Sequence, residues 1–286
     1  MDFRTDLAIE IKESLPRKTS DGIETVSFEK SGVKVTKIKI TNSEGEQAIG
    51  KPCGTYITAE IPNLTKYSCA DESVMATLGN LLSDLLPCDG TVLTVGLGND
   101  NITPDALGPL SCSMILATRH ISGELAKSVG FDSLRPSAVH TPGVLGQTGV
   151  ESAEIIKGIV RQINPAAVIV IDALAARRLS RLGCTVQMSD TGIIPGSGVG
   201  NSRAEISKST LGIPVVSIGV PTVVDAGTLV HGLIGESTPL KKENSNMIIT
   251  PREIDLVIDR AARLVGMAVN KALQPHISAE EILMLL

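Results

Sequence analysis

Two aspartates stand just after short apolar runs of the chain, and their type and placement point to hydrolytic chemistry. Val92–Val95 leads through a glycine turn to Asp105, and Val168–Ile171 runs directly into Asp172. If both runs are parallel strands of one sheet, their carboxyl ends open on the same crevice, where sites lie in such folds. Two adjacent carboxylates do not both ionise readily, so one keeps its proton while the other is a base. Such a pair could activate a water and polarise a carbonyl, although each aspartate could also simply cap the helix that follows it.

Two glycine-rich segments accompany these aspartates. The first contains Gly96, Gly98 and Asn99, and the second, residues 190–202, contains Gly196 and Gly198. We expect backbone amides of these residues to line the substrate site and to stabilise a developing oxyanion. The alternative is that both segments are turns that only shape the site. A dinucleotide-binding fingerprint is not complete, because its third glycine is absent from the first segment.

Other side chains of chemical interest lack the spacing that a site requires. The four histidines are isolated and the five cysteines include no CxxC pair, so we predict no metal site, no cofactor and no disulfide framework. Ser197 lacks the strand-to-helix elbow of a hydrolase nucleophile. Asp190-Thr191-Gly192 resembles the triplet of pepsin-like proteases, but those folds are all-β, so we expect Asp190 at most to line the cleft.

The aspartates need a sheet to bring them together, and the hydrophobic pattern predicts one. Residues 33–40 alternate between apolar and polar, as half-exposed strands do. We predict a single α/β domain over residues 1–286, with a mainly parallel twisted sheet flanked by helices (phosphorylase/hydrolase-like). A candidate antiparallel β-subdomain is inserted near the N-terminus, at residues 23–62. Three other runs are continuously apolar, which is typical of buried parallel strands: 91–95, 166–171 and 213–220.

Helical periodicity fills the intervals between these strands. Apolar residues recur at three- and four-residue spacing before Pro16, before Pro87 and after Pro251. We expect Thr250 and Pro251 to begin the last helix, as its N-cap and first-turn residues. Residues 132–150 are predicted as loop. The predicted helices cover residues 7–15, 71–85, 105–129, 151–163, 173–182, 224–233 and 251–273.

Composition excludes two classes of partner. The net charge is −5 with no Lys/Arg block, and aromatic residues make up only 2% of the chain, which argues against nucleic-acid binding. No apolar run approaches the roughly 18 residues of a membrane span, and no signal-peptide core is present. We therefore expect a cytoplasmic protein without a membrane partner.

Several motifs in order are more specific than any of these features alone, and with them the chain resembles the germination proteases of endospore-forming bacteria. The resemblance covers residues 1–10 and most of 90–230. It rests on Phe3–Glu10, Val95–Asn99, Thr103–Pro109, Thr141–Val144, Gly146–Gly149, Ile171–Ala175, Ser189–Gly192, Pro195–Asn201, Gly212–Val215 and Gly219–Ala226.

The resemblance implies an activity, a catalytic pair and a compartment. Members of the family degrade small acid-soluble spore proteins during germination, as atypical acid proteases that need no metal. Their fold is similar to that of hydrogenase maturation proteases. Carried over by position, the catalytic residues are Asp105 and Asp172. The resemblance further implies a homotetramer in the spore core or forespore.

The resemblance also implies a zymogen that removes its own leader. Family substrates are cut after Glu, before a hydrophobic residue and Ala, and Thr5-Asp6-Leu7-Ala8 looks like that pattern. We therefore expect residues 1–6 to be a propeptide, cleaved between Asp6 and Leu7. The alternative is that these residues are simply the first strand or helix of the fold.

Two other functions compete with this interpretation. In a nickel-sensing protease of the hydrogenase-maturation type, the acidic pair would bind metal with a third ligand, and tight stoichiometric metal binding would favour it. A non-enzymatic α/β ligand-binding domain would use the glycine segments instead. Thermal stabilisation by a ligand, without peptidase activity, would favour that second alternative.

Overall fold

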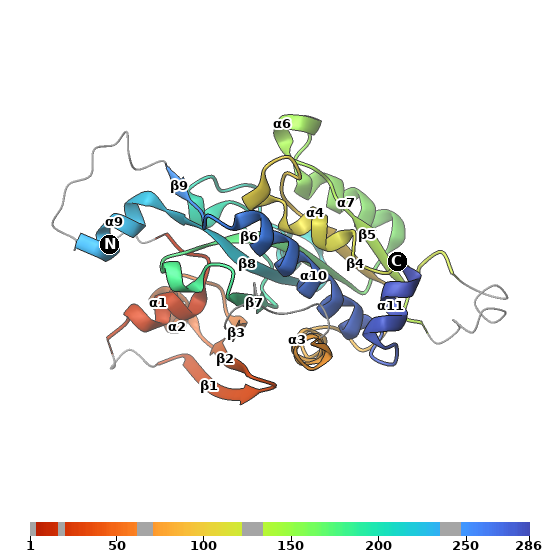
Figure 1. Ribbon diagram of the computed structural model, residues 1–286, viewed down its shortest axis with the longest axis horizontal. Coiled ribbons are helices and arrows are strands. Elements are labelled where there is room, and N and C mark those ends of the chain that lie inside the picture. The colour runs from red at the N-terminus through yellow and green to blue at the C-terminus, as the bar shows by residue number, and fades with distance from the viewer. Residues whose placement is uncertain (1–3, 17–20, 62–70, 122–133, 235–246) are drawn as a thin grey trace.

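A computed structural model describes residues 4–16, 21–61, 71–121, 134–234 and 247–286, and in these residues helices cover both faces of one large sheet (Figure 1). The described residues form nine strands in the order β1-β2-β3-β7-β8-β6-β4-β5, with β9 paired to β8. The strands are β1 (Ile23–Lys30), β2 (Val33–Ile40), β3 (Gly54–Glu60), β4 (Val92–Gly96), β5 (Ser137–His140), β6 (Ala167–Ala176), β7 (Thr185–Ser189), β8 (Val215–Asp225) and β9 (Ile248–Ile249).

The sheet has a parallel part and an antiparallel part. Strands β8, β6, β4 and β5 run parallel to one another, whereas β1, β2, β3, β7 and β8 pair antiparallel. The α/β class is therefore confirmed, and so is the antiparallel insertion near the N-terminus, of which residue 62 lies outside the described residues. That insertion continues the main sheet, because β3 pairs with β7 along its length.

The helices of the described residues are α1 (Ala8–Ser14), α2 (Ser43–Ile49), α3 (Glu72–Ser83), α4 (Leu107–Cys112), α6 (Leu145–Thr148), α7 (Ser152–Ile163), α8 (Lys208–Leu211), α9 (Ala226–Ile234), α10 (Ile254–Leu273) and α11 (Ala279–Leu285). Helices such as α3 and α7 bury one face and expose the other, whereas the second half of α10 is buried on nearly all sides.

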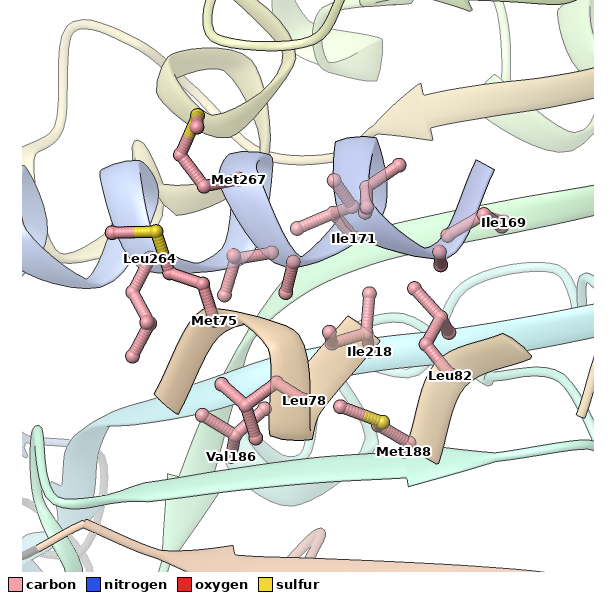
Figure 2. Close-up of a cluster of buried hydrophobic side chains, with 14 of the residues drawn as sticks. Met75, Leu78, Leu82, Ile169, Ile171, Val186, Met188, Ile218, Leu264 and Met267 are labelled. Atoms are coloured by element: carbon pink, nitrogen blue, oxygen red, sulfur yellow. The ribbon is translucent and has the colours of Figure 1, made fainter. Parts of the chain in front are cut away.

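The main hydrophobic core lies between the sheet and the pair α3 and α10. Figure 2 shows Leu78 and Leu82 of α3 beside sheet residues such as Met188 and Ile218, whereas Met75 of α3 extends toward Leu264 of α10. On the opposite face, α7 packs against β4 and β6. A third cluster joins α1 and α2 to β2, β3 and the end of β6. This third cluster anchors the N-terminal segment beside the carboxyl end of β6.

One predicted helix and the predicted first residue of the last helix are wrong. The helix expected over 105–129 is a 3₁₀ turn (Thr103–Asp105) followed by α4, which ends at Cys112, and residues 122–133 lie outside the described residues. The last helix begins at Ile254, not at Pro251; the Thr250 hydroxyl donates to a carbonyl of β8 instead of capping. Strand β5 lies within residues 132–150, which were predicted as loop, and the sequence pattern does not predict β7.

The most consequential correction concerns Asp172. Residues 173–182 were expected to be helical, so that Asp172 would end its strand, but β6 runs on to Ala176. The segment Ala173–Ala176 has a helix-favouring composition, yet it pairs with β8 up to Val224 through one irregularity. Tertiary pairing overrides weak local propensity here. Asp172 thus lies within a strand, and the residues after it form a wall of the site.

Candidate active site

A cavity of about 580 Å³ opens beside the carboxyl ends of β4 and β6, and both predicted aspartates line it. Among the residues predicted for the substrate site, Gly98 and Gly196 also line this cavity. The wall contains two further carboxylates, those of Asp6 from the N-terminal segment and of Glu151 at the start of α7. The structure therefore places four acidic side chains around one cavity, three of them aspartates.

Asp105 is held by the backbone of the first glycine-rich segment. The Asn99 amide donates to Asp105 Oδ2 at 2.8 Å. Gly98 makes this approach possible, because it has φ = +114° and a Cβ there would lie 1.9 Å from the Asp105 carbonyl oxygen. Partial burial raises the pKa of Asp105, and the Asn99 amide opposes that rise. The Asn99 amide thus positions a carboxylate, while Gly96 packs against the backbone of Gly108 on α4.

Asp172 is the more deeply buried of the pair, with 6% of its surface exposed. Burial is the largest cause that raises its pKa well above the ordinary value, and the charges of Asp105 and Asp6 add to the rise. The Ala173 amide, which donates to Asp172 Oδ1 at 3.0 Å, acts in the opposite direction. Since Asp105 is half-buried, the arrangement favours a protonated Asp172 beside an ionised Asp105.

Asp6 is fixed in the cavity wall by hydrogen bonds to residues far away in the sequence, among them Ala175 and Ser197. Its amide donates to the Ala175 carbonyl at 2.9 Å, and the Ala175 amide donates to Asp6 Oδ2 at 2.8 Å. The Ser197 hydroxyl donates to Asp6 Oδ1 at 2.8 Å. Leu7, the next residue, is fully buried in the cluster around α1 and α2. The two residues of the predicted cleavage site are therefore docked, one in the cavity wall and the other in the core.

The second glycine-rich segment lies against the N-terminal residues. A Cβ on Gly198 would lie 2.2 Å from Asp6 Oδ2, and one on Gly200 would lie 2.9 Å from the Arg4 guanidinium. Arg4 also pairs with Asp225 of β8, 3.5 Å away. Close approach of the two segments thus requires glycine at these positions. Residues 1–3, the rest of the predicted propeptide, lie outside the described residues.

Two other predicted features fall outside the cavity. Asp190 accepts a hydrogen bond from the Thr55 amide at 2.7 Å and does not line the cavity, so its role is to join β3 to the loop after β7. Within the described part of the chain, no cluster of three or more His, Cys, Asp or Glu side chains could hold a metal.

Sequence reasoning missed how Asp6 is held. Ser197 lacks the context of a nucleophile, and the structure shows its hydroxyl donating to the Asp6 carboxylate instead. The contact with the Ala175 amide does not follow from the sequence, because the local pattern of residues 173–182 predicts a helix and not a strand edge. The only signal in the sequence was the close glycine spacing around Ser197, which permits an approach of another segment without naming that segment.

Comparison with known proteins adds the family. The family model described as "Germination protease" matches residues 4–236. The chain belongs to the germination protease family. It is 43% identical to the germination protease of Caldanaerobacter subterraneus subsp. tengcongensis over 99% of this chain and 98% of that one. It is 39% identical to that of Clostridium tetani, with coverage of 99% and 98%, and 36% identical to that of Bacillus pumilus, with coverage of 97% and 95%.

Membership of the germination protease family makes this chain a peptidase of spore germination that acts on a protein substrate. A solved [NiFe] hydrogenase maturation protease, HycI from Thermococcus kodakarensis, is 17% identical, with a TM-score of 0.36, and covers 66% of this chain and 98% of its own. Searching the described residues for a helix long and apolar enough to cross a membrane finds none.

The raised pKa of Asp172 predicts a pH-dependent stability difference. The folded chain binds the Asp172 proton more tightly than the unfolded chain, so this group lowers stability as pH rises from its ordinary pKa through the raised one. Asp172→Asn removes that loss. We expect the melting temperature of the variant to exceed that of the wild type at pH 7 and to equal it below pH 4. Each kcal/mol gained in the free energy of unfolding should raise the melting temperature by about 2–4 °C. A gain of the same size at every pH would contradict this origin.

A substitution of Gly198 tests whether this glycine lets the N-terminal segment pack against the cavity wall. The Cβ of Gly198→Ala would displace the Asp6 carboxylate and free residues 4–6 from the cavity wall. We expect trypsin to cut after Arg4 on the order of 10-fold faster in this variant, because release exposes that bond; mass spectrometry measures the rate. The matched control is Gly158→Ala on α7, where an added Cβ meets nothing within 4 Å. Equal rates for the two variants would show that Gly198 does not hold the segment in place.

Proposed function

We propose that this germination protease degrades small acid-soluble spore proteins with the aspartate pair Asp105 and Asp172 and an activated water. The observation that carries the proposal is the asymmetry of the two carboxyl groups in one cavity. Asp172 is buried and faces two other carboxylates, whereas Asp105 is half-exposed and receives the Asn99 amide. A carboxyl group that holds its proton to higher pH and one that ionises more readily are therefore available together.

In the proposed reaction Asp105 is the base and Asp172 is the acid. Asp105 takes a proton from water, and the water oxygen bonds to the carbonyl carbon of the scissile peptide. The Asp172 proton stabilises the oxyanion that forms, with Gly98 and Gly196 lining the same cavity. As the C–N bond breaks, the leaving amine takes the proton from Asp105. The products are a carboxylate and an amine, and no cofactor enters the balance.

We also propose that the chain is made as a zymogen that cleaves itself between Asp6 and Leu7. The location of Asp6 in the cavity wall supports this, because the leader then occupies space that a substrate needs. Residues 1–6 would leave as the propeptide, and Leu7 would become the new N-terminus. From the family resemblance we further propose a homotetramer that acts in the spore core or forespore.

Loss of either aspartate tests the catalytic pair. We expect Asp105→Asn and Asp172→Asn each to lower the rate of cleavage of a purified small acid-soluble spore protein by at least about 100-fold, because general acid–base catalysis contributes that much. Fragments are identified by mass spectrometry, and cleavage after Glu in EDTA is expected of the wild type. Asp190→Asn, outside the cavity, is the matched control and should keep wild-type turnover. Normal turnover in either cavity variant, or its loss in EDTA, would contradict the proposed mechanism.

The pH profile tests which aspartate carries the proton. We expect kcat/KM to fall as pH rises through the raised pKa of Asp172, because the acid is lost, and to fall at low pH as Asp105 becomes protonated. Measurement of kcat/KM on a peptide substrate from pH 4 to 9 gives both limbs. A rate that climbs steadily to pH 9 would show that no protonated carboxyl group is required.

A further inference from the structure

The bond between Asp6 and Leu7 is gripped by one side chain from the middle of the sheet. Gln187 Nε2 donates to the Asp6 carbonyl oxygen at 2.7 Å. On the far side of the bond, Gln187 Oε1 accepts from the Ala8 amide at 2.8 Å. A carboxamide presents one donor and one acceptor side by side, so it can hydrogen-bond to the carbonyl of one residue and to the amide two residues later. A shift of the segment by one residue would break both contacts.

Gln187 belongs to the same row of the sheet as Asp172. In β8, Gly219 pairs with Asp172 on one side and with Gln187 on the other. Residues paired in register project on the same face of a sheet. The neighbours of Gln187, Val186 and Met188, project into the main core on the opposite face. The carboxamide and the buried acid are therefore separated by a single strand and point to the same side.

Burial makes these hydrogen bonds costly to lose. Gln187 is 8% exposed, and Ala8, whose amide it accepts, is fully buried. A buried polar group without a partner is strongly unfavourable, so the segment is held in one register. The Asp6 carbonyl oxygen has two lone pairs, of which Gln187 uses one. The other remains for an acid that protonates or polarises the carbonyl.

We infer that Gln187 is the residue that positions the Asp6–Leu7 bond for hydrolysis and sets where the chain is cut. This inference rests on the proposed self-cleavage and adds the group that selects the bond. In the reaction, water adds to the Asp6 carbonyl carbon and the bond to the Leu7 nitrogen breaks, leaving a carboxylate on Asp6 and an amine on Leu7. Gln187 Nε2 stays bonded to the oxygen on which negative charge develops.

The chain offers a matched control for this side chain. Gln274, 4% exposed, makes the same double contact on Arg135: its Oε1 accepts from the Arg135 amide at 3.0 Å, and its Nε2 donates to the Arg135 carbonyl at 2.7 Å. Gln274 is the C-cap residue of α10, and neither it nor Gln187 lines the cavity; its partner Arg135 also lies outside the cavity, whereas Asp6, the partner of Gln187, lines it. Loss of either carboxamide removes two buried hydrogen bonds. Only those of Gln187 involve the predicted cleavage site.

The experiment follows self-cleavage of the full chain by intact mass and N-terminal sequencing. Gln187→Met keeps the length of the side chain and loses both contacts; Gln187→Glu keeps the acceptor for Ala8 and loses the donor to Asp6. We expect both variants to cut the Asp6–Leu7 bond on the order of 100-fold more slowly than the wild type, with part of the residual cleavage at neighbouring bonds. Gln274→Met should cut at the wild-type rate and position, even if its melting temperature falls as far as that of Gln187→Met.

Each other outcome identifies a different error. A wild-type rate and position in Gln187→Met would overturn the inference. A wild-type rate in Gln187→Glu alone would also overturn it, because Gln187 would then only anchor Ala8. Equal slowing in Gln274→Met would assign the effect to general stability. If the wild type never cuts its own chain but still degrades a spore protein, self-cleavage and this inference fail together while the proposed peptidase mechanism stands.

Discussion

A carboxyl group buried within a strand is the constraint on which the site depends. Asp172 cannot be solvated as an anion where β6 places it, and two other carboxylates face it, so its neutral form is favoured. A carboxyl group that keeps its proton to higher pH than usual can serve as an acid only beside a base, and Asp105 stays closer to solvent and accepts a hydrogen bond from the Asn99 amide. The two positions, one within β6 and one in the 3₁₀ turn after β4, therefore raise the pKa values of two identical side chains to different extents. Asp6 accentuates this difference, because its charge is one of the three causes of the raised pKa of Asp172. If Asp6 leaves the cavity, as in the proposed self-cleavage, that contribution is lost and the pKa of Asp172 moves back toward its ordinary value.

The glycines of the site allow neighbouring backbone segments and the aspartate side chains to approach closely. Gly98 lets the backbone fold onto Asp105, Gly96 and Gly108 bring α4 against β4, and Gly198 receives the Asp6 carboxylate. At each position a Cβ would lie under 3 Å from atoms of the neighbouring segment. What the sequence presents as two glycine-rich loops is thus two contact surfaces, one for Asp105 and one for the N-terminal segment. Both aspartates and the N-terminal segment can share one cavity because these segments approach without side chains between them.

The parts of the fold that could be predicted are those coded locally. Continuous apolar runs predict β4, β6 and β8, because a strand buried on both faces is apolar throughout. Apolar residues at three- and four-residue spacing predict α1, α3 and α7, because a helix buried on one face repeats its apolar residues at that interval. The aspartate pair followed from the rule that parallel strands open their carboxyl ends together. The extension of β6 did not, because Ala173–Ala176 is helix-favouring alone and is a strand only through pairing with β8. The hold on Asp6 was equally hidden, since Ala175 and Ser197 contact it across 169 and 191 residues of sequence. No spacing rule encodes such contacts.

The two sides of the Asp6–Leu7 bond are anchored by different means, and this determines what can leave after a cut. On the downstream side, the buried Glu10 accepts hydrogen bonds from the amides of Arg177 and Arg178, and Leu7 is fully buried. On the upstream side, Asp6 depends on Ala175, Ser197 and Gln187, and Arg4 on a half-exposed ion pair. The proposed hydrolysis would add a second carboxylate to Asp6 in a cavity that also contains Asp105, Asp172 and Glu151, and like charges at close range repel. The proposed cleavage would therefore weaken the upstream side alone, so that residues 4–6 could leave while α1 keeps its place in the third hydrophobic cluster.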